Sequence, residues 1–158
     1  GYVEAERMAV LRRSLLGFRP PVNRLQLAIK RSTELRVIDE PTRRTWWEAA
    51  TTTGISLRRY ELINNAGELL GSVSFWDMQP LAATWGIVAA GLLHVDIAGS
   101  KRRQGLAHYL VAEAIHDLGE EGVAIVETHV AESNPAAKKL FNKLGFETTE
   151  LGTIFKRA

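Results

Sequence analysis

Cysteine is absent from the sequence. Without a thiol, the chain forms no disulfide, offers no thiolate ligand to a metal and has no cysteine nucleophile. No metal site is predicted from the remaining residues either. The lack of disulfides is compatible with a reducing compartment, and we expect the protein in the cytoplasm.

Long apolar runs are also missing. The longest uncharged stretch, residues 78–93, contains glutamine, proline, threonine and two glycines, so it does not resemble a membrane span. The sequence starts with polar and charged residues, and no signal peptide is predicted. Because the first residue is Gly1 rather than methionine, we interpret the sequence as a piece of a longer chain.

Neither sign of charge dominates, since 20 Lys and Arg stand against 18 Asp and Glu, for a net charge of +2. The basic residues form scattered pairs and one triplet, Lys101-Arg102-Arg103, without a sustained basic face or interleaved aromatics. A nucleic-acid-binding module is therefore not predicted. A length of 158 residues with 46% hydrophobic residues suits a single globular domain.

Periodicity and turn residues predict the order of the elements. We expect helices over residues 3–18, 41–52, 104–118 and 135–144. Strands are predicted within 24–38 and over 56–63, 69–76, 85–97, 123–130 and 146–155, with a hairpin turn at 64–67 and a loop at 77–83. This order predicts an α+β fold with an antiparallel first half and a β-α-β-α-β second half. We divide the chain into an N-terminal helix and proline-containing connector, residues 1–23, and a main domain, residues 24–158.

One segment carries a chemical pattern, the passage from a predicted strand into a helix through Arg102-Arg103-Gln104-Gly105-Leu106-Ala107. The first N–H groups of a helix have no partner inside it, and the helix dipole adds partial positive charge there. A pyrophosphate can bind directly on those amides. Gly105 would leave the backbone bare, and the two arginines would add full charges. The pattern alone is weak, but its place between strand and helix strengthens it.

Here the sequence resembles the GNAT superfamily of N-acyltransferases. Val95-Asp96-Ile97 is similar to the family's strand that pairs with the pantetheine arm, and Arg102 to Ala107 is similar to its pyrophosphate loop. The segment from Asn134 to Phe146, which contains Ala137 and Phe141, is similar to the family's second signature. The resemblance is specific over residues 85–155 and covers residues 24–76 only by the order of elements.

The resemblance implies the GNAT fold, a mostly antiparallel mixed sheet with helices on both faces and a splayed central strand pair. It also implies binding of acetyl-CoA or coenzyme A. The residues expected to contact that cofactor are Val95, Ile97, Arg102, Arg103, Gln104, Gly105, Leu106, Ala107, Asn134, Ala137 and Phe141. Asn134 is also suited to cap the helix that starts at Pro135.

The reaction implied by the resemblance is direct attack of a primary amine on the thioester, with backbone N–H groups near residues 95–97 stabilising the oxyanion. Many family members have a tyrosine acid where this chain has Phe141, so Ser133 or a water is the alternative proton donor. Candidate bases are His94 and Asp96, which share one face of their strand, and Glu127 and His129 form a similar pair on the next strand.

Other interpretations stay open. Phe141 favours a degenerate GNAT domain that binds CoA or serves as a scaffold in a larger protein. A Rossmann site is disfavoured, because the loop lacks the Gly-x-Gly start. The expected partners are a small-molecule or peptide amine and, since GNAT domains occur in tandem, a second GNAT domain or a second copy; no nucleic acid or membrane partner is expected. The aromatic residues Trp46, Trp47, Phe75, Trp76 and Trp85 lie in the half that builds the acceptor pocket in this family.

Overall fold

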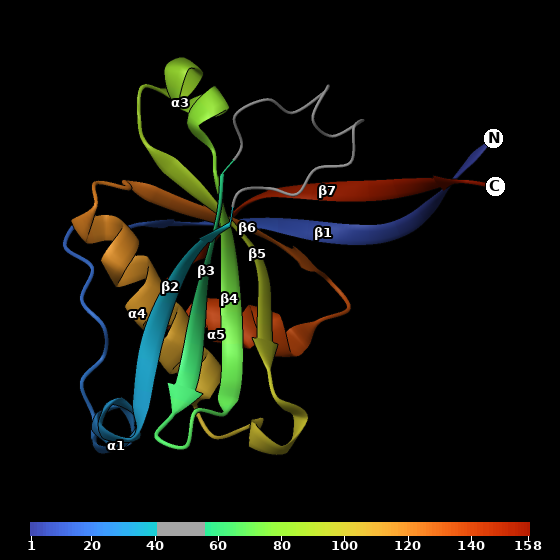
Figure 1. The fold of residues 1–158 in the computed structure, drawn as a ribbon. Coiled ribbons are helices and arrows are strands. Elements are labelled where there is room, and N and C mark those ends of the chain that lie inside the picture. Colours follow the sequence, from blue (N-terminus) through green and yellow to red (C-terminus); the bar gives the residue numbers. More distant parts are fainter. Residues whose placement is uncertain (41–55) are drawn as a thin grey trace.

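The computed structural model describes residues 1–40 and 56–158. Within this part of the chain, seven strands form one sheet in the order β2-β3-β4-β5-β6-β1-β7 (Figure 1). The strands are β1 (Tyr2–Ser14), β2 (Thr33–Glu40), β3 (Leu57–Asn64), β4 (Leu69–Asp77), β5 (Ala89–Ile97), β6 (Ile125–Ala131) and β7 (Glu147–Arg157). The helices are α1 (Arg24–Ser32), α3 (Gln79–Trp85), α4 (Leu106–Glu120) and α5 (Pro135–Lys143), with a short 3₁₀ turn at Gly99–Lys101. No described helix has the length and apolar character of a membrane span.

The elements of the second half and of the central hairpin agree closely with those predicted from the sequence. Strands β3 and β4 pair antiparallel around the turn at residues 64–67, where the Asn64 side chain accepts from the backbone N–H groups of Ala66 and Glu68. β5 and β6 are parallel, and every other described pair is antiparallel. The predicted α+β class with a mixed, mostly antiparallel sheet is therefore confirmed.

The predicted N-terminal helix is wrong, because residues 2–14 form β1. This strand lies between β6 and β7 and pairs antiparallel with both. Its residues favour a helix, but the tertiary contacts favour a strand. The two flanking strands form hydrogen bonds with its backbone, and Ala9 and Leu11 are buried on one face. The division of the chain at residue 23 stays a prediction, but the first strand belongs to the same sheet as the rest.

Two further segments differ from the predicted elements, and a third lies outside the described residues. The segment 24–38 holds helix α1 followed by β2 rather than a single strand, and Asn23 caps α1 by accepting from the Gln26 N–H. The predicted loop at 77–83 is largely helix α3, which tolerates a proline in its first turn. The predicted helix at 41–52 lies outside the described residues.

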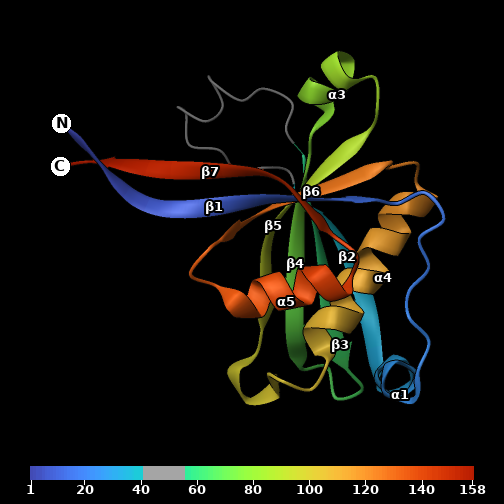
Figure 2. The same ribbon diagram turned by 180° about the vertical axis from the view of Figure 1, so that it is seen from behind.

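Helices α4 and α5 cover one face of the sheet, as Figures 1 and 2 show from opposite sides. Leu110, Val111 and Ile115 of α4 are fully buried and form the centre of the core with Tyr60 and Val73. Among the described residues, α3 alone lies near the opposite face.

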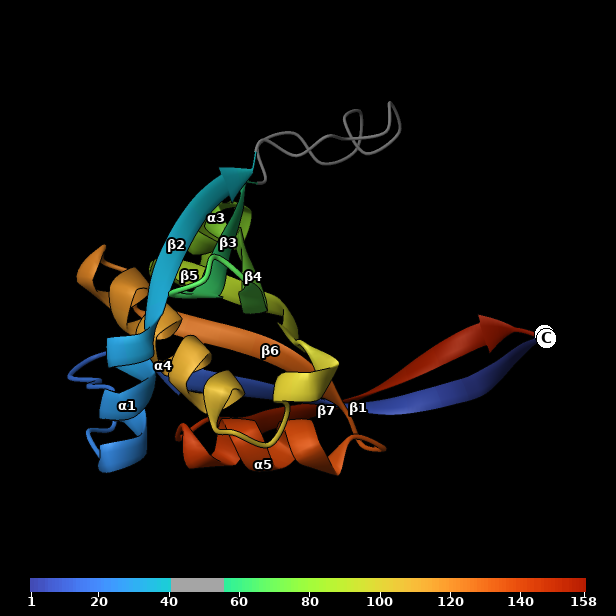
Figure 3. The same ribbon diagram turned by 60° about the horizontal axis from the view of Figure 1, so that its bottom comes forward.

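Beyond Met8, where pairing with β6 ends, β1 and β7 continue together as a two-stranded ribbon. Figure 3 shows this ribbon projecting away from the helices, with the C-terminus at its tip. The two chain ends meet there, since the Ala158 N–H donates to the Gly1 carbonyl at 3.0 Å. The ribbon exposes apolar side chains on both strands, namely Tyr2, Val3, Ile154 and Phe155.

Candidate acyl-CoA site

A cavity of about 1000 Å³ opens where β5 and β6 separate. The two strands pair only from Ala89 to Leu92 and from Ile125 to Thr128. At this last rung the Thr128 hydroxyl donates to the Leu92 carbonyl at 3.2 Å. Beyond it both strands continue without pairing to each other, and the cavity runs between them to α5 and the start of α4. The predicted splayed strand pair is therefore present.

A β-bulge lies at the point of separation. Ser74 of β4 faces His94, whereas Phe75 faces Leu92, so Leu93 is an extra residue with no partner on β4. The bulge shifts the alternation of side chains by one position. Val95 and Ile97 therefore pack against the core, and His94 and Asp96 face the opposite side.

The edge of β5 beyond Leu92 faces the cavity without a strand partner. Its N–H and C=O groups can pair with an extended ligand, as an added strand would. Both Val95 and Ile97 line the cavity. An unpaired strand edge along a cavity is the arrangement that an amide-containing arm such as pantetheine requires.

Helix α4 begins at the cavity without a side-chain cap. Its N-cap, Gly105, has φ of 75°, in the left-handed region, and no side chain satisfies the first turn. The free N–H groups belong to Leu106, Ala107 and His108, all of which line the cavity. Arg103 also has a positive φ, 62°, which is uncommon outside glycine. Alternating backbone of this kind forms an anion-binding concavity.

Gly105 has a further constraint that the sequence did not indicate. A Cβ at this position would lie 2.8 Å from Cδ2 of Leu25, because α1 packs beside the start of α4. The neighbouring contact joins Gln26 Nε2 and His108 Nδ1 at 3.4 Å. The left-handed φ therefore favours glycine at position 105, whereas a Cβ there would mainly require the half-exposed Leu25 side chain to move.

Positive charge dominates the cavity wall. One carboxylate lines it, Asp96, against five cationic side chains, Lys101, Arg102, Arg103, Lys139 and Lys143. Burial, and then the Lys143 ammonium, hold the pKa of His108 below its ordinary value. A polyanion such as a pyrophosphate with a further phosphate matches this field.

The structure brings most of the predicted site residues together. Twelve of them line the cavity: His94, Val95, Asp96, Ile97, Arg102, Arg103, Gly105, Leu106, Ala107, Asn134, Ala137 and Phe141. Gln104 is exposed on the loop and is not part of the wall. Ser133 is not part of it either, and its hydroxyl donates to Glu6 Oε1 at 3.0 Å.

Two residues of the second signature have clear local roles. Asn134 Oδ1 accepts from the Ala137 N–H at 3.1 Å and so caps α5, while its amide nitrogen has no described partner. Phe141 is buried and packs edge-on against Phe146, with ring centroids 5.1 Å apart. Both residues also border the cavity, so a structural role does not exclude contact with a ligand.

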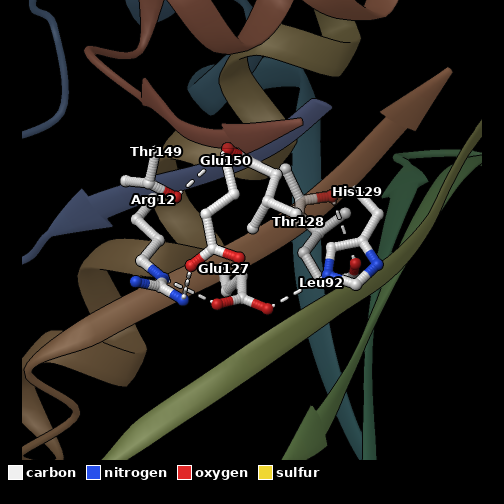
Figure 4. Close-up of polar contacts among 8 residues, drawn as sticks. Arg12, Leu92, Glu127, Thr128, His129, Thr149 and Glu150 are labelled. Carbon is white, nitrogen blue, oxygen red and sulfur yellow. Dashed lines mark hydrogen bonds and ion pairs between the residues drawn. The ribbon is translucent and has the colours of Figure 1, made fainter. Parts of the chain in front are cut away.

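Glu127 and His129 form a hydrogen-bonded pair in the structure (Figure 4). Glu127 Oε1 lies 3.0 Å from His129 Nε2, and Arg12 Nε donates to Glu127 Oε2 at 2.7 Å. Their side chains face away from the core, as do those of His94 and Asp96, because Val126 and Val130 of the same strand are buried in it. His129 lines the cavity.

Several wall residues were not predicted from the sequence. Lys139 and Lys143 are four residues apart on α5, and their helical spacing offered a signal. The contact of α1 with the start of α4 offered none, because it joins distant segments. Among the aromatic residues, Phe75 is in the core and Trp76 and Trp85 do not line the cavity, whereas Trp46 and Trp47 lie outside the described residues.

Comparison with known families decides the classification. The model of the Acetyltransferase (GNAT) family matches residues 24–146. The chain belongs to the GNAT acetyltransferase family. Acetyl transfer from an acyl-CoA is the general reaction of GNAT proteins, and proteins with the GNAT fold generally bind acetyl-CoA or CoA. A search of curated proteins gave no significant match.

Solved structures share the GNAT fold at low identity. A tandem GNAT protein from the clavulanic acid biosynthesis pathway matches with a TM-score of 0.69 and 16% identity, over 98% of this chain and 55% of that one. A GCN5-related N-acetyltransferase from Sphaerobacter thermophilus matches with a TM-score of 0.65 and 17% identity, over 98% and 52%. An aminoglycoside acetyltransferase from an uncultured soil metagenomic sample, in complex with sisomicin, matches with a TM-score of 0.62 and 9% identity, over 82% and 98%. This GNAT chain thus spans about half the length of the first two.

Proposed function

We propose that this GNAT domain transfers an acyl group, with acetyl as the first candidate, from acyl-CoA to a primary amine. The observation that carries the proposal is the uncapped start of α4, which opens onto a basic cavity that continues to the splayed strands. One end of this cavity suits phosphates and the other end suits an extended amide chain. Acetyl-CoA has both parts in that order.

The residues present fit the cofactor. The N–H groups of Leu106 and Ala107, with Arg102 and Arg103 beside them, would hold the pyrophosphate. The free edge of β5 at Val95 and Ile97 would pair with the pantetheine arm. Acyl-CoA, when bound, supplies an activated thioester.

The backbone at the bulge is suited to polarise the thioester carbonyl. Leu93 has no partner on β4, and the strand has none on the β6 side beyond Leu92. Backbone N–H groups held in place in this way stabilise a developing oxyanion without reorganisation. Positioning the amine beside the carbonyl supplies a further part of the acceleration.

Proton transfer to the leaving thiolate is the weaker part of the site. Phe141 has no hydroxyl and is packed in the core. Ser133, the alternative donor, donates a hydrogen bond to Glu6 and does not line the cavity. A water is therefore the better candidate for protonating the thiolate. An alkyl thiol with a pKa of about 8.5 leaves moderately well without an acid.

His94 and Asp96 remain candidates for removing the proton of the amine, because both line the cavity. The second candidate function is a degenerate GNAT domain that binds CoA without turnover, or a scaffold in a larger protein, and Phe141 is the observation that favours it. We also propose a cytoplasmic location, and a second GNAT domain or a second copy of the chain as a partner.

Calorimetric titration with acetyl-CoA and with CoA tests the cofactor part. We expect micromolar binding that weakens with salt. Lys139→Gln should weaken binding about three- to fivefold, the effect of about 1 kcal/mol from one partly exposed charge. Lys138→Gln on the same helix is the matched control, since Lys138 does not line the cavity.

Release of free thiol with a panel of alkylamines and arylamines tests the reaction. Binding of acetyl-CoA without any amine-dependent thiol release would favour the degenerate domain that binds CoA without turnover.

In the calorimetric titration, folded protein that gives no heat of binding would refute the cofactor site itself.

A further inference from the structure

A buried carboxylate lies beside the point where the central strands separate. Glu127 is on β6, one position before the last rung with β5, and it is buried on the sheet face away from α4. A buried charge is costly unless it is paired. Both of its oxygens are engaged, one by Arg12 Nε at 2.7 Å and the other by His129 Nε2 at 3.0 Å.

Arg12 is itself fixed from several sides. It lies directly opposite Glu127 in the β1–β6 register. A second guanidinium nitrogen donates to Glu150 of β7 at 3.4 Å, and its Cζ lies 5.2 Å from the centre of the Trp85 ring. Figure 4 shows Glu127 between Arg12 and His129, with Glu150 above. Strands that are far apart in sequence thus hold one carboxylate in a single orientation.

His129 differs from the rest of this cluster because it reaches the cavity. Its side chain is 59% exposed, whereas that of Glu127 is 11% exposed. It lies one residue beyond Thr128, where pairing with β5 ends. An ordinary cross-strand ion pair between Arg12 and Glu127 would not need a histidine on the cavity side of the carboxylate.

On the basis of the proposed function, we infer that His129 is the general base that takes a proton from the acceptor amine, oriented by Glu127. An ionised carboxylate only accepts hydrogen bonds, so Nε2 carries the hydrogen that faces Glu127. The lone pair of the neutral imidazole is then on Nδ1. Arg12 is a positioning residue, which pairs with the Glu127 carboxylate and keeps it in place.

The ammonium of the acceptor gives one proton to Nδ1 of His129, which becomes imidazolium and later returns the proton to solvent. The neutral amine forms the C–N bond with the thioester carbon, and the C–S bond breaks. The second proton of the amine passes through water to the CoA thiolate. The products are the amide, CoA thiol and one proton.

Other charged and titratable groups lie on the strands around His129. Arg12 and Glu150 lie on the β1 and β7 side, and His94 and Asp96 lie on β5 across the splay. His94 lines the same cavity but has no hydrogen bond to a described residue, so nothing described orients its ring. A carboxylate partner fixes the tautomer and orientation of His129, which is the arrangement used for histidine bases.

The test compares His129→Gln with His116→Gln, a matched change at a histidine of α4 that does not line the cavity. With an alkylamine at pH 7, His129→Gln should lower kcat/KM about 100-fold. With an arylamine, which is already neutral, both variants should stay within about threefold of the wild type. The alkylamine deficit should also shrink as the pH approaches the pKa of the amine, about 10.4 for a lysine-like acceptor. Calorimetry should give unchanged acetyl-CoA affinity for both variants.

A second measurement does not depend on turnover. Nitrogen chemical shifts of His129 should show a hydrogen on Nε2 in the wild type and a mixture of tautomers in Glu127→Gln, with thermal melts confirming that both proteins are folded. Equal losses with both amine classes, full activity of His129→Gln, or an Nδ1–H tautomer in the wild type would each overturn the assignment. If the wild type binds acetyl-CoA but acylates no amine, the proposed function fails before any variant is compared, and the base role fails with it.

Discussion

Leu11 offers a direct test of whether the first strand is part of the folded domain. It is 1% exposed and belongs to the central core, although it lies outside the residues that the family model matches. In β1 it is held between Thr128 of β6 and Thr148 of β7. With strands on both sides, the backbone has little freedom to collapse into the space left by a smaller side chain.

Leu11→Ala should therefore lower the free energy of unfolding by about 3 kcal/mol, within the range for buried leucines. For a domain of this size, this corresponds to a fall in Tm of roughly 6 to 12 °C. Chemical denaturation followed by circular dichroism measures the first quantity and a thermal melt the second. The slope m should stay constant, since the folded structure is retained.

Leu16→Ala is the matched control, because Leu16 is the same residue type five positions along and is 93% exposed. It should change stability by less than about 0.5 kcal/mol. If Leu11→Ala were as mild as the control, residues 2–14 would not be packed as a strand of this sheet. The reasoning from burial would then be refuted.

Two other predictions concern α4 and its contacts. Tyr60→Phe removes the hydrogen bond from the buried Tyr60 hydroxyl to Asp117 Oδ2 at 2.8 Å, and should cost about 1 to 2 kcal/mol in chemical denaturation, whereas Tyr2→Phe at the exposed ribbon should cost nothing measurable. Burial and Lys143 lower the pKa of His108 in the folded state, so folding favours the neutral ring; stability should fall as the pH drops below about 6.5, the ordinary value, and His108→Gln should flatten this part of a pH–stability curve. A wild-type curve that rises toward acid pH over this interval would contradict the sign.

The parts of the fold that follow from local patterns were predicted well. Alternation with the Asn64 turn predicted the β3–β4 hairpin, and apolar spacing after Gly105 predicted α4. The loop before α4 was also identified and lines the cavity as expected, because an uncapped helix start with glycine and arginines has a short and local signature. Seven of the predicted residues outside this loop also line the cavity, and they come from the strand and the helix signature that the sequence indicated.

Features that depend on distant segments were not predictable in the same way. Residues 2–14 have a helix-favouring composition, and they form a strand because they pair with β6 on one side and β7 on the other. The contact of Leu25 with Gly105 and the ion pair of Arg12 with Glu127 join residues far apart in the chain. The sequence identified Glu127 and His129 as a pair on one strand face, but burial of the carboxylate and the contribution of Arg12 required the structure.

The position of β1 has a consequence for how the protein is made. Its partners, β6 and β7, begin at Ile125 and Glu147, so a strand that is synthesised early in this domain pairs with two strands that are synthesised much later. At translation rates of about 5 to 20 residues per second, residues 2–14 wait on the order of ten seconds for their neighbours. During this interval the strand exposes its apolar side chains and its unpaired edges. Synthesis rate and early chaperone contact should therefore affect the yield of folded protein more than they would for a domain built from local pairs.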